Sequence, residues 1–140
     1  MLEIATGVGV SAASVAAASL VSLAALITAL SLQVSRLRLK YRVSWGDGGH
    51  RDLLVAMRAH GNTLEQSALY GLLALAYAGL PGARADLVAG LATAVVLARV
   101  VHAGGVFGRR LVWRQGAHGV TVLVQAALAV AIAHRAGPWA

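Results

Sequence analysis

Three polar residues in the second apolar segment, Arg58, Asn62 and Glu65, have types and spacing that could do chemistry. They are four and then three residues apart, which places them on one face of a helix. Arginine binds carboxylates, an amide side chain binds amides, and glutamate binds ammonium groups. A charge at the centre of a membrane costs about 2.5–3.5 kcal/mol, so such a stripe needs partners or a ligand.

Two interpretations of this stripe stay open on spacing alone. In the first, Arg58 and Glu65 neutralise each other or partners on neighbouring helices, and Asn62 joins helices by hydrogen bonds. In the second, the stripe holds a polar ligand between helices. His60 points elsewhere, about 200° around the helix from Arg58.

The balance of charge favours the ligand. Arg99 and His102 share a face of the third segment, and Glu65 is the single acid expected at this depth of the membrane. Snorkelling to lipid headgroups explains the basic run from Arg36 to Arg42 but explains Arg58 and Arg99 poorly. We therefore expect an anionic ligand to balance cations from all four segments, namely Arg36 or Arg38, Arg58, Arg99 and Arg114.

The elements that must position these residues are membrane helices. The 140-residue chain is 59% hydrophobic and 12% charged, with a mean hydropathy of +0.73, whereas soluble domains are about 45–50% apolar and about 25% charged. A spanning helix needs about 20 mostly apolar residues. We predict one all-α domain over 1–140, an integral membrane four-helix bundle with helices near 6–34, 51–80, 85–107 and 116–134.

The net charge of +7 does not indicate nucleic-acid binding, because the basic residues cluster in the connections 36–51 and 109–114. The positive-inside rule places these connections in the cytoplasm and both termini outside it. The stretch from Ile4 to Ser35 carries no charge and is much longer than the roughly 7–15 apolar residues of a signal peptide, so it is predicted to be a retained helix.

Other classes of site are excluded or disfavoured. The chain has no Cys, which excludes disulfides and a cysteine nucleophile. No metal site is predicted, since His60 and His102 stand alone on their helix faces.

The segment Arg58-Ala59-His60-Gly61-Asn62-Thr63-Leu64-Glu65 resembles the signature of the MAPEG family, membrane-associated proteins in eicosanoid and glutathione metabolism. Other segments from Ser31 to Gln125 are similar to family members in the same order. They are Ser31-Leu32-Gln33-Val34 with the basic run ending at Arg42-Val43-Ser44, the loop Gly46-Asp47-Gly48-Gly49, the stretch Ala98-Arg99-Val100-Val101-His102, and Arg114 followed by Thr121.

The resemblance implies a bacterial inner-membrane homotrimer that binds glutathione, as co-substrate, between subunits near the cytoplasmic face. It implies a glutathione-dependent transferase or peroxidase acting on hydrophobic electrophiles or lipid hydroperoxides reached from the bilayer. Arg114 would stabilise the glutathione thiolate. The other residues carried over to the glutathione site are Arg36, Arg38, Arg58, His60, Asn62, Glu65, Arg99 and His102.

Two positions depart from the family pattern. Several eukaryotic members have a Tyr one turn beyond the helix-three His and another directly after the helix-two Glu, where this chain has Val106 and Gln66. These changes leave open an alternative, a non-catalytic membrane module that binds glutathione, lipid or another anion. A small transporter is less favoured, because one polar cluster near one face offers no alternating path.

Overall fold

The computed structural model describes residues 10–137, and within this range the chain is a bundle of four long helices without a strand. The helices are α1 (Ala12–Tyr41), α2 (Arg51–Ala78), α3 (Ala85–Phe107) and α4 (Leu111–Ala136). The predicted all-α four-helix fold is therefore confirmed.

The first helix is shifted along the chain relative to the predicted 6–34. Positions 6–9 lie outside the described residues, and α1 begins at Ala12, where the Ser11 hydroxyl caps the helix by accepting a hydrogen bond from the Ser14 amide. At the other end the helix continues through the basic run to Tyr41. The predicted end was wrong because Arg and Lys are good helix formers and suit the negative end of a helix dipole.

The fourth helix also differs from its predicted range of 116–134, since it begins at Leu111 and continues to Ala136. The apolar run suggested the later start, but Val112, Trp113 and Gln115 are compatible with a helix. As a result, Arg114 lies in the first turn of α4. The second helix ends at Ala78, slightly before the predicted residue 80, and the third spans 85–107 as predicted.

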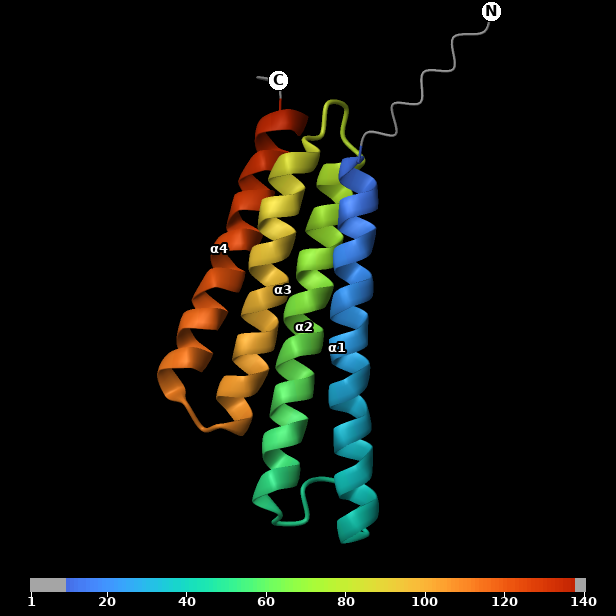
Figure 1. The fold of residues 1–140 in the computed structure, drawn as a ribbon, viewed down its shortest axis with the longest axis vertical. Coiled ribbons are helices and arrows are strands. Elements are labelled where there is room, and N and C mark those ends of the chain that lie inside the picture. The colour runs from blue at the N-terminus through green and yellow to red at the C-terminus, as the bar shows by residue number, and fades with distance from the viewer. Residues whose placement is uncertain (1–9, 138–140) are drawn as a thin grey trace, which may run out of the picture.

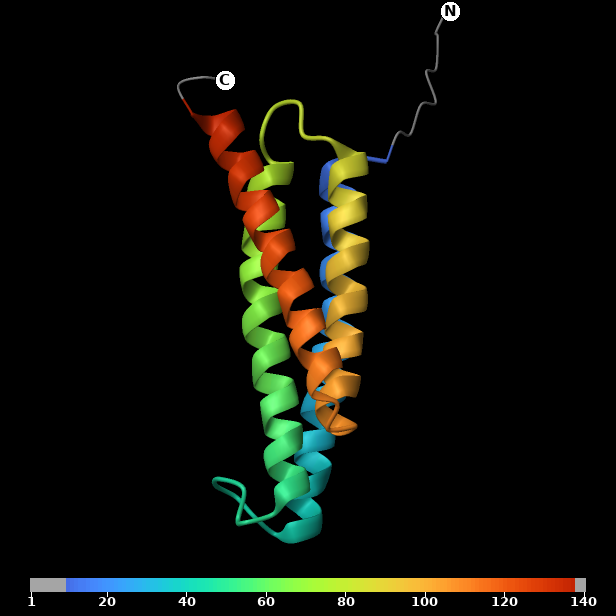
Figure 2. The ribbon, with the colours of Figure 1, turned by 90° about the vertical axis from the view of Figure 1, so that its left-hand side faces the viewer.

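The helices form a layered arrangement in which α2 and α3 are central (Figure 1). Helix α1 packs on α2 and α3 from one side, α4 packs on them from the other, and in the described range α1 and α4 do not touch. Helix α4 crosses the bundle obliquely (Figure 2). Helix α1 and the start of α2 extend beyond the α3–α4 connection (Figure 1), so one end of the bundle is stepped.

The bundle interior is packed with apolar side chains, while large apolar side chains also cover its outside. Leu23, Tyr70 and Leu128 are fully buried in the main core, whereas Val21, Leu72 and Leu123 are 71%, 70% and 70% exposed. Helices α1, α3 and α4 are long and apolar enough to cross a bilayer. A helix that is apolar on its outer face needs lipid around it.

Candidate functional site

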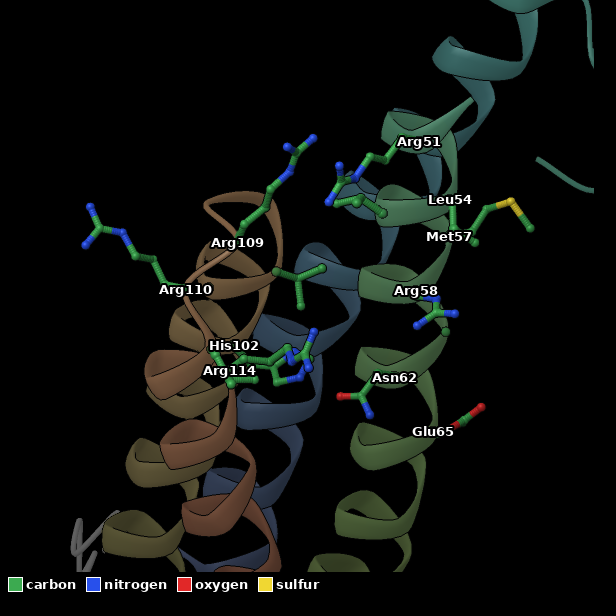
Figure 3. Close-up of a pocket in the computed structure, with 15 residues that line it drawn as sticks. Arg51, Leu54, Met57, Arg58, Asn62, Glu65, His102, Arg109, Arg110 and Arg114 are labelled. Carbon is green, nitrogen blue, oxygen red and sulfur yellow. The ribbon is translucent and has the colours of Figure 1, made fainter. Parts of the chain in front are cut away.

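A groove of about 900 Å³ opens between α2 and the α3–α4 hairpin, at the stepped end of the bundle. Figure 3 shows its polar residues on these two sides. Five arginines line it, namely Arg51, Arg58, Arg109, Arg110 and Arg114. Its remaining polar side chains are Asn62, Glu65 and His102.

The helix-two stripe divides between the inside and the rim of the groove. Asn62 points across the groove toward His102 and Arg114, while the side chains of Arg58 and Glu65, which line the groove from the same helix, point away from these two residues (Figure 3). Both Arg58 and Glu65 are exposed in the single chain. The same helix therefore presents an amide inside the groove and a pair of opposite charges at its outer edge.

A buried guanidinium sits behind the groove wall. Arg99 is 0% exposed, and its Nη1 donates to Asn62 Oδ1 at 3.0 Å. Its Nη2 donates to the Ala117 carbonyl at 3.5 Å, and its Nε has no partner. Arg99 therefore contacts the groove wall through Asn62: its Nη1 occupies Oδ1, so the further hydrogen-bonding capacity of this side chain lies in its amide nitrogen, which can only donate.

His102 forms part of the inner wall. It is 4% exposed, lines the groove, and its Nδ1 has no hydrogen-bond partner in the structure. A buried polar atom without a partner is costly unless water or a ligand satisfies it. The wall of the groove thus contains an imidazole with one buried nitrogen that has no partner among the described residues.

The charge of the groove is not balanced by protein groups. Over residues 10–137 the one ion pair joins Arg84 and Asp86, near the α2–α3 connection at the opposite end of the bundle. The hydrogen bond from Arg84 to Asp86 raises the pKa of Arg84 above its usual value. The mutual neutralisation of Arg58 and Glu65, one part of the first interpretation above, is not observed. The other part, a hydrogen bond that joins Asn62 to a neighbouring helix, is confirmed by the bond from Arg99. Among the described residues, the five arginines and the one glutamate that line the groove therefore form no ion pair.

The structure brings together five of the residues predicted from the sequence: Arg58, Asn62, Glu65, His102 and Arg114. It leaves Arg36, Arg38, His60 and Arg99 outside the groove of the single chain. Arg36 is exposed on α1, and His60 is half-buried on another face of α2. Helix α1 does not border the groove, which is why its cations do not reach it.

In the single chain, Arg38 binds the α1–α2 loop. Its Nη1 donates to the carbonyl oxygens of Val43 at 3.4 Å, Ser44 at 3.0 Å and Gly46 at 3.2 Å. Three carbonyls surrounding one guanidinium hold the α1–α2 loop in a single shape. Arg38 thus stabilises the loop in this structure.

Three groove arginines, Arg51, Arg109 and Arg110, were interpreted from the sequence as connection charges alone. The α3–α4 connection is too short to carry its arginines away from the helices, and this length was visible in the sequence. Arg109 also has a φ of 54°, a left-handed conformation that is unfavourable for a residue with a Cβ and that glycine usually occupies.

Gly105 permits the close approach that places Arg114. A Cβ added at Gly105 would lie 3.0 Å from the Arg114 amide nitrogen and 3.2 Å from Trp113 Cβ. The Arg110 amide also donates to the Gly105 carbonyl at 2.8 Å. The end of α3 and the start of α4 are therefore in direct backbone contact, which directs the first turn of α4 onto the groove.

Comparison with known proteins gives one consistent result. The sequence model of the MAPEG family matches residues 16–134. The inner membrane protein YecN of Escherichia coli, from strain K12 and from strain O6:H1, is 34% identical over 98 residues, which cover 70% of this chain and 74% of YecN. No solved structure matches the chain.

Proposed function

This chain belongs to the MAPEG family of membrane proteins, and from that premise we propose that it binds glutathione in the groove and transfers it to hydrophobic electrophiles. Reduction of lipid hydroperoxides by glutathione is the related reaction of the same proposal. The family includes glutathione-dependent enzymes of both kinds.

The observation that carries the proposal is the uncompensated charge of the groove. Five arginines and one glutamate line it, and none of them forms an ion pair within the described chain. Glutathione carries two carboxylates and one ammonium, so cations in excess of one acid match its charge pattern. A volume of about 900 Å³ lies in the range of pockets for molecules of this size.

The residues divide into binding and catalytic roles. Arg51 and Arg58 would bind carboxylates, Glu65 would bind the ammonium, and Asn62 would donate to a peptide carbonyl. Arg114 would stabilise the thiolate, because a nearby cation lowers the pKa of a thiol. The thiolate would then form a carbon–sulfur bond with the electrophile as the leaving group departs with its electron pair.

The two positions where related enzymes carry Tyr support a larger role for the cations. Val106 lines the groove without a hydroxyl. Gln66 is bound by helix α4 instead. Gln125 Nε2 donates to the Gln66 backbone carbonyl at 3.1 Å and to the Gln66 side-chain Oε1 at 3.2 Å. Thiolate stabilisation would therefore rest on Arg114 rather than on a phenol.

The absence of a Tyr hydroxyl at positions 66 and 106 favours a second candidate, a non-catalytic membrane module that binds glutathione or another anion. The groove would then supply affinity without enough stabilisation of the thiolate for turnover. Under either function, we propose a homotrimer in which the exposed Arg58 and Glu65 flank of α2 meets a neighbouring subunit. That arrangement would bring α1 of the neighbour, with Arg36, to the groove.

The test is binding and turnover measured on the same reconstituted protein. Calorimetry with glutathione gives the affinity, and conjugation of chlorodinitrobenzene gives kcat/KM. Arg114→Ala should lower kcat/KM by about 100-fold, as loss of one charge-stabilising donor does. Arg84→Ala, at the opposite end of the bundle, is the matched control and should retain both the glutathione affinity and the kcat/KM of the wild type.

The outcomes separate the candidates. Saturable binding that is lost in Arg58→Ala, without product, supports the non-catalytic module. Turnover that is lost in Arg114→Ala supports the transferase. Failure of the wild-type protein to bind glutathione would overturn the transferase and would restrict the non-catalytic module to another anion.

A further inference from the structure

The segment 36–50, here called the α1–α2 tip, combines exposed cations with exposed apolar side chains. Leu39 is 81% exposed and Trp45 is 90% exposed, and the exposed cations of the tip are Arg36, Lys40 and Arg42. Tryptophan beside Lys and Arg is typical of the boundary between a membrane and water. The groove described above uses none of these residues.

Trp45 is exposed on a loop whose backbone is held by hydrogen bonds. Arg38 binds the carbonyls of Val43, Ser44 and Gly46, which lie on both sides of Trp45. The Gly49 amide donates to Asp47 Oδ1 at 3.1 Å, closing a second turn. The loop is therefore built to present this indole outward, because the backbone on each side of it is fixed.

The two nearby acids, Asp47 and Asp52, offset only part of the charge of the four cations between residues 36 and 42. Asp47 is engaged by the Gly49 amide, and Asp52 accepts a hydrogen bond from the Tyr41 hydroxyl at 2.6 Å. Within the described range 10–137, the ion pair, Arg84 with Asp86, lies at the other end of the bundle. The tip thus presents positive charge outward, which fits an anionic partner.

The length of α1 sets the depth of the tip. Its 30 residues span about 45 Å at 1.5 Å per residue, against about 30 Å for the hydrocarbon core and about 40–45 Å for a bilayer with its headgroups. Within α1 the first charge is Arg36. When the uncharged part of α1, residues 12–35, fills the hydrocarbon core of the bilayer, the residues after Arg36 lie among the headgroups.

The direction of the loop agrees with this depth. Figure 2 shows the α1–α2 connection reaching sideways past α2, across the bundle axis rather than along it. A membrane-spanning bundle stands roughly along the bilayer normal, so a sideways loop lies along the membrane surface. At the same end Trp113, in the first turn of α4, is 59% exposed, as expected for a second interfacial aromatic.

We propose that the α1–α2 tip docks on anionic phospholipid headgroups, with Trp45 in the interfacial layer and Lys40 and Arg42 at the lipid phosphates. A lipid surface fits better than a soluble protein, because the tip lies at headgroup depth and extends in the membrane plane. This surface is independent of glutathione binding, so the two proposals stand or fall separately.

The experiment follows Trp45 alone, in a variant carrying Trp113→Phe and Trp139→Phe. The protein is placed in nanodiscs of phosphatidylcholine, or of equal parts phosphatidylcholine and phosphatidylglycerol. Acrylamide, which is uncharged, quenches the indole wherever water reaches it. We expect the quenching constant to fall about twofold or more in the anionic discs, with a blue-shifted emission.

Paired variants isolate the charges. Lys40→Gln with Arg42→Gly removes two cations, and each lost charge should reduce the ratio of docked to free tip about fivefold. Lys40→Arg with Arg42→Lys preserves the charge and should preserve the protection. Salt at about 1 M, which shortens the screening length to about 3 Å, should weaken it.

Two results would overturn the proposal. One is equal quenching of Trp45 in both kinds of disc, which would make the tip a water-facing surface for a soluble partner. The other is protection that survives loss of Lys40 and Arg42. Helical circular dichroism of each variant checks that the bundle is intact.

Discussion

Arg99 on α3 donates from Nη1 to Asn62 Oδ1 on α2 at 3.0 Å. The guanidinium is fully buried and the amide lines the groove. This bond fixes which end of the amide faces Arg99, since a guanidinium can only donate. Asn62 is thereby prepared to donate to a ligand, although no part of Arg99 lines the groove.

Asn62→Asp tests this orientation. A carboxylate would pair with buried Arg99, so thermal stability should be kept or increased. The variant would lose the amide donor and would add a negative charge beside an anionic ligand. Glutathione affinity should therefore fall about tenfold or more, as when a buried hydrogen bond is not made. Thermal unfolding and calorimetry on the same preparation measure both quantities. Unchanged affinity would show that Asn62 serves Arg99 alone.

Gly105→Ala should disturb the placement of Arg114. Its Cβ would come within 3.0 Å of the Arg114 amide nitrogen, a backbone atom that cannot rotate away. We expect a loss of about 1–3 kcal/mol in stability, typical of overpacking, and a lower kcat/KM than in wild type. Gly104→Ala is the matched control, because nothing lies within 4 Å of its added Cβ, and it should behave as wild type.

Arg109→Gly should separate stability from binding. Glycine tolerates the left-handed conformation, so relief of strain should increase the free energy of unfolding by about 1 kcal/mol. Loss of a groove cation should weaken glutathione binding. Arg42 has the same φ of 54° but lies away from the groove, so Arg42→Gly should give the stability gain without the loss of affinity. Equal affinities of the two variants would contradict a role for Arg109 in binding.

Arg38→Ala should destabilise the α1–α2 loop. Hydrogen bonds from a charged group contribute about 1.5–3 kcal/mol, so the variant should unfold at lower temperature and expose the loop to proteolysis. Arg36→Ala, an exposed neighbour, should change stability by less than about 0.5 kcal/mol. If Arg36 reaches the groove of a neighbouring subunit, its variant should instead lower glutathione affinity. Proteolysis, thermal unfolding and calorimetry together distinguish the two arginines.

The class of the fold was predictable from local properties of the chain. Apolar runs long enough to span a bilayer, interrupted by basic connections, can form little other than membrane helices, because the backbone must satisfy its own hydrogen bonds in lipid. The helix ends at Tyr41 and Leu111 were not predictable in this way. A charged residue ends an apolar run without ending a helix.

By itself, the sequence determined the four helices and the shared face of Arg58, Asn62 and Glu65, because the period of a helix depends on spacing alone. Only the tertiary structure decided which cations meet. Arg38 turned toward its own loop, Arg99 was buried behind Asn62, and Arg109 and Arg110 joined the groove. These outcomes depend on how α3 and α4 approach at Gly105 and on the separation of α1 from α4, which are packing relations between distant segments.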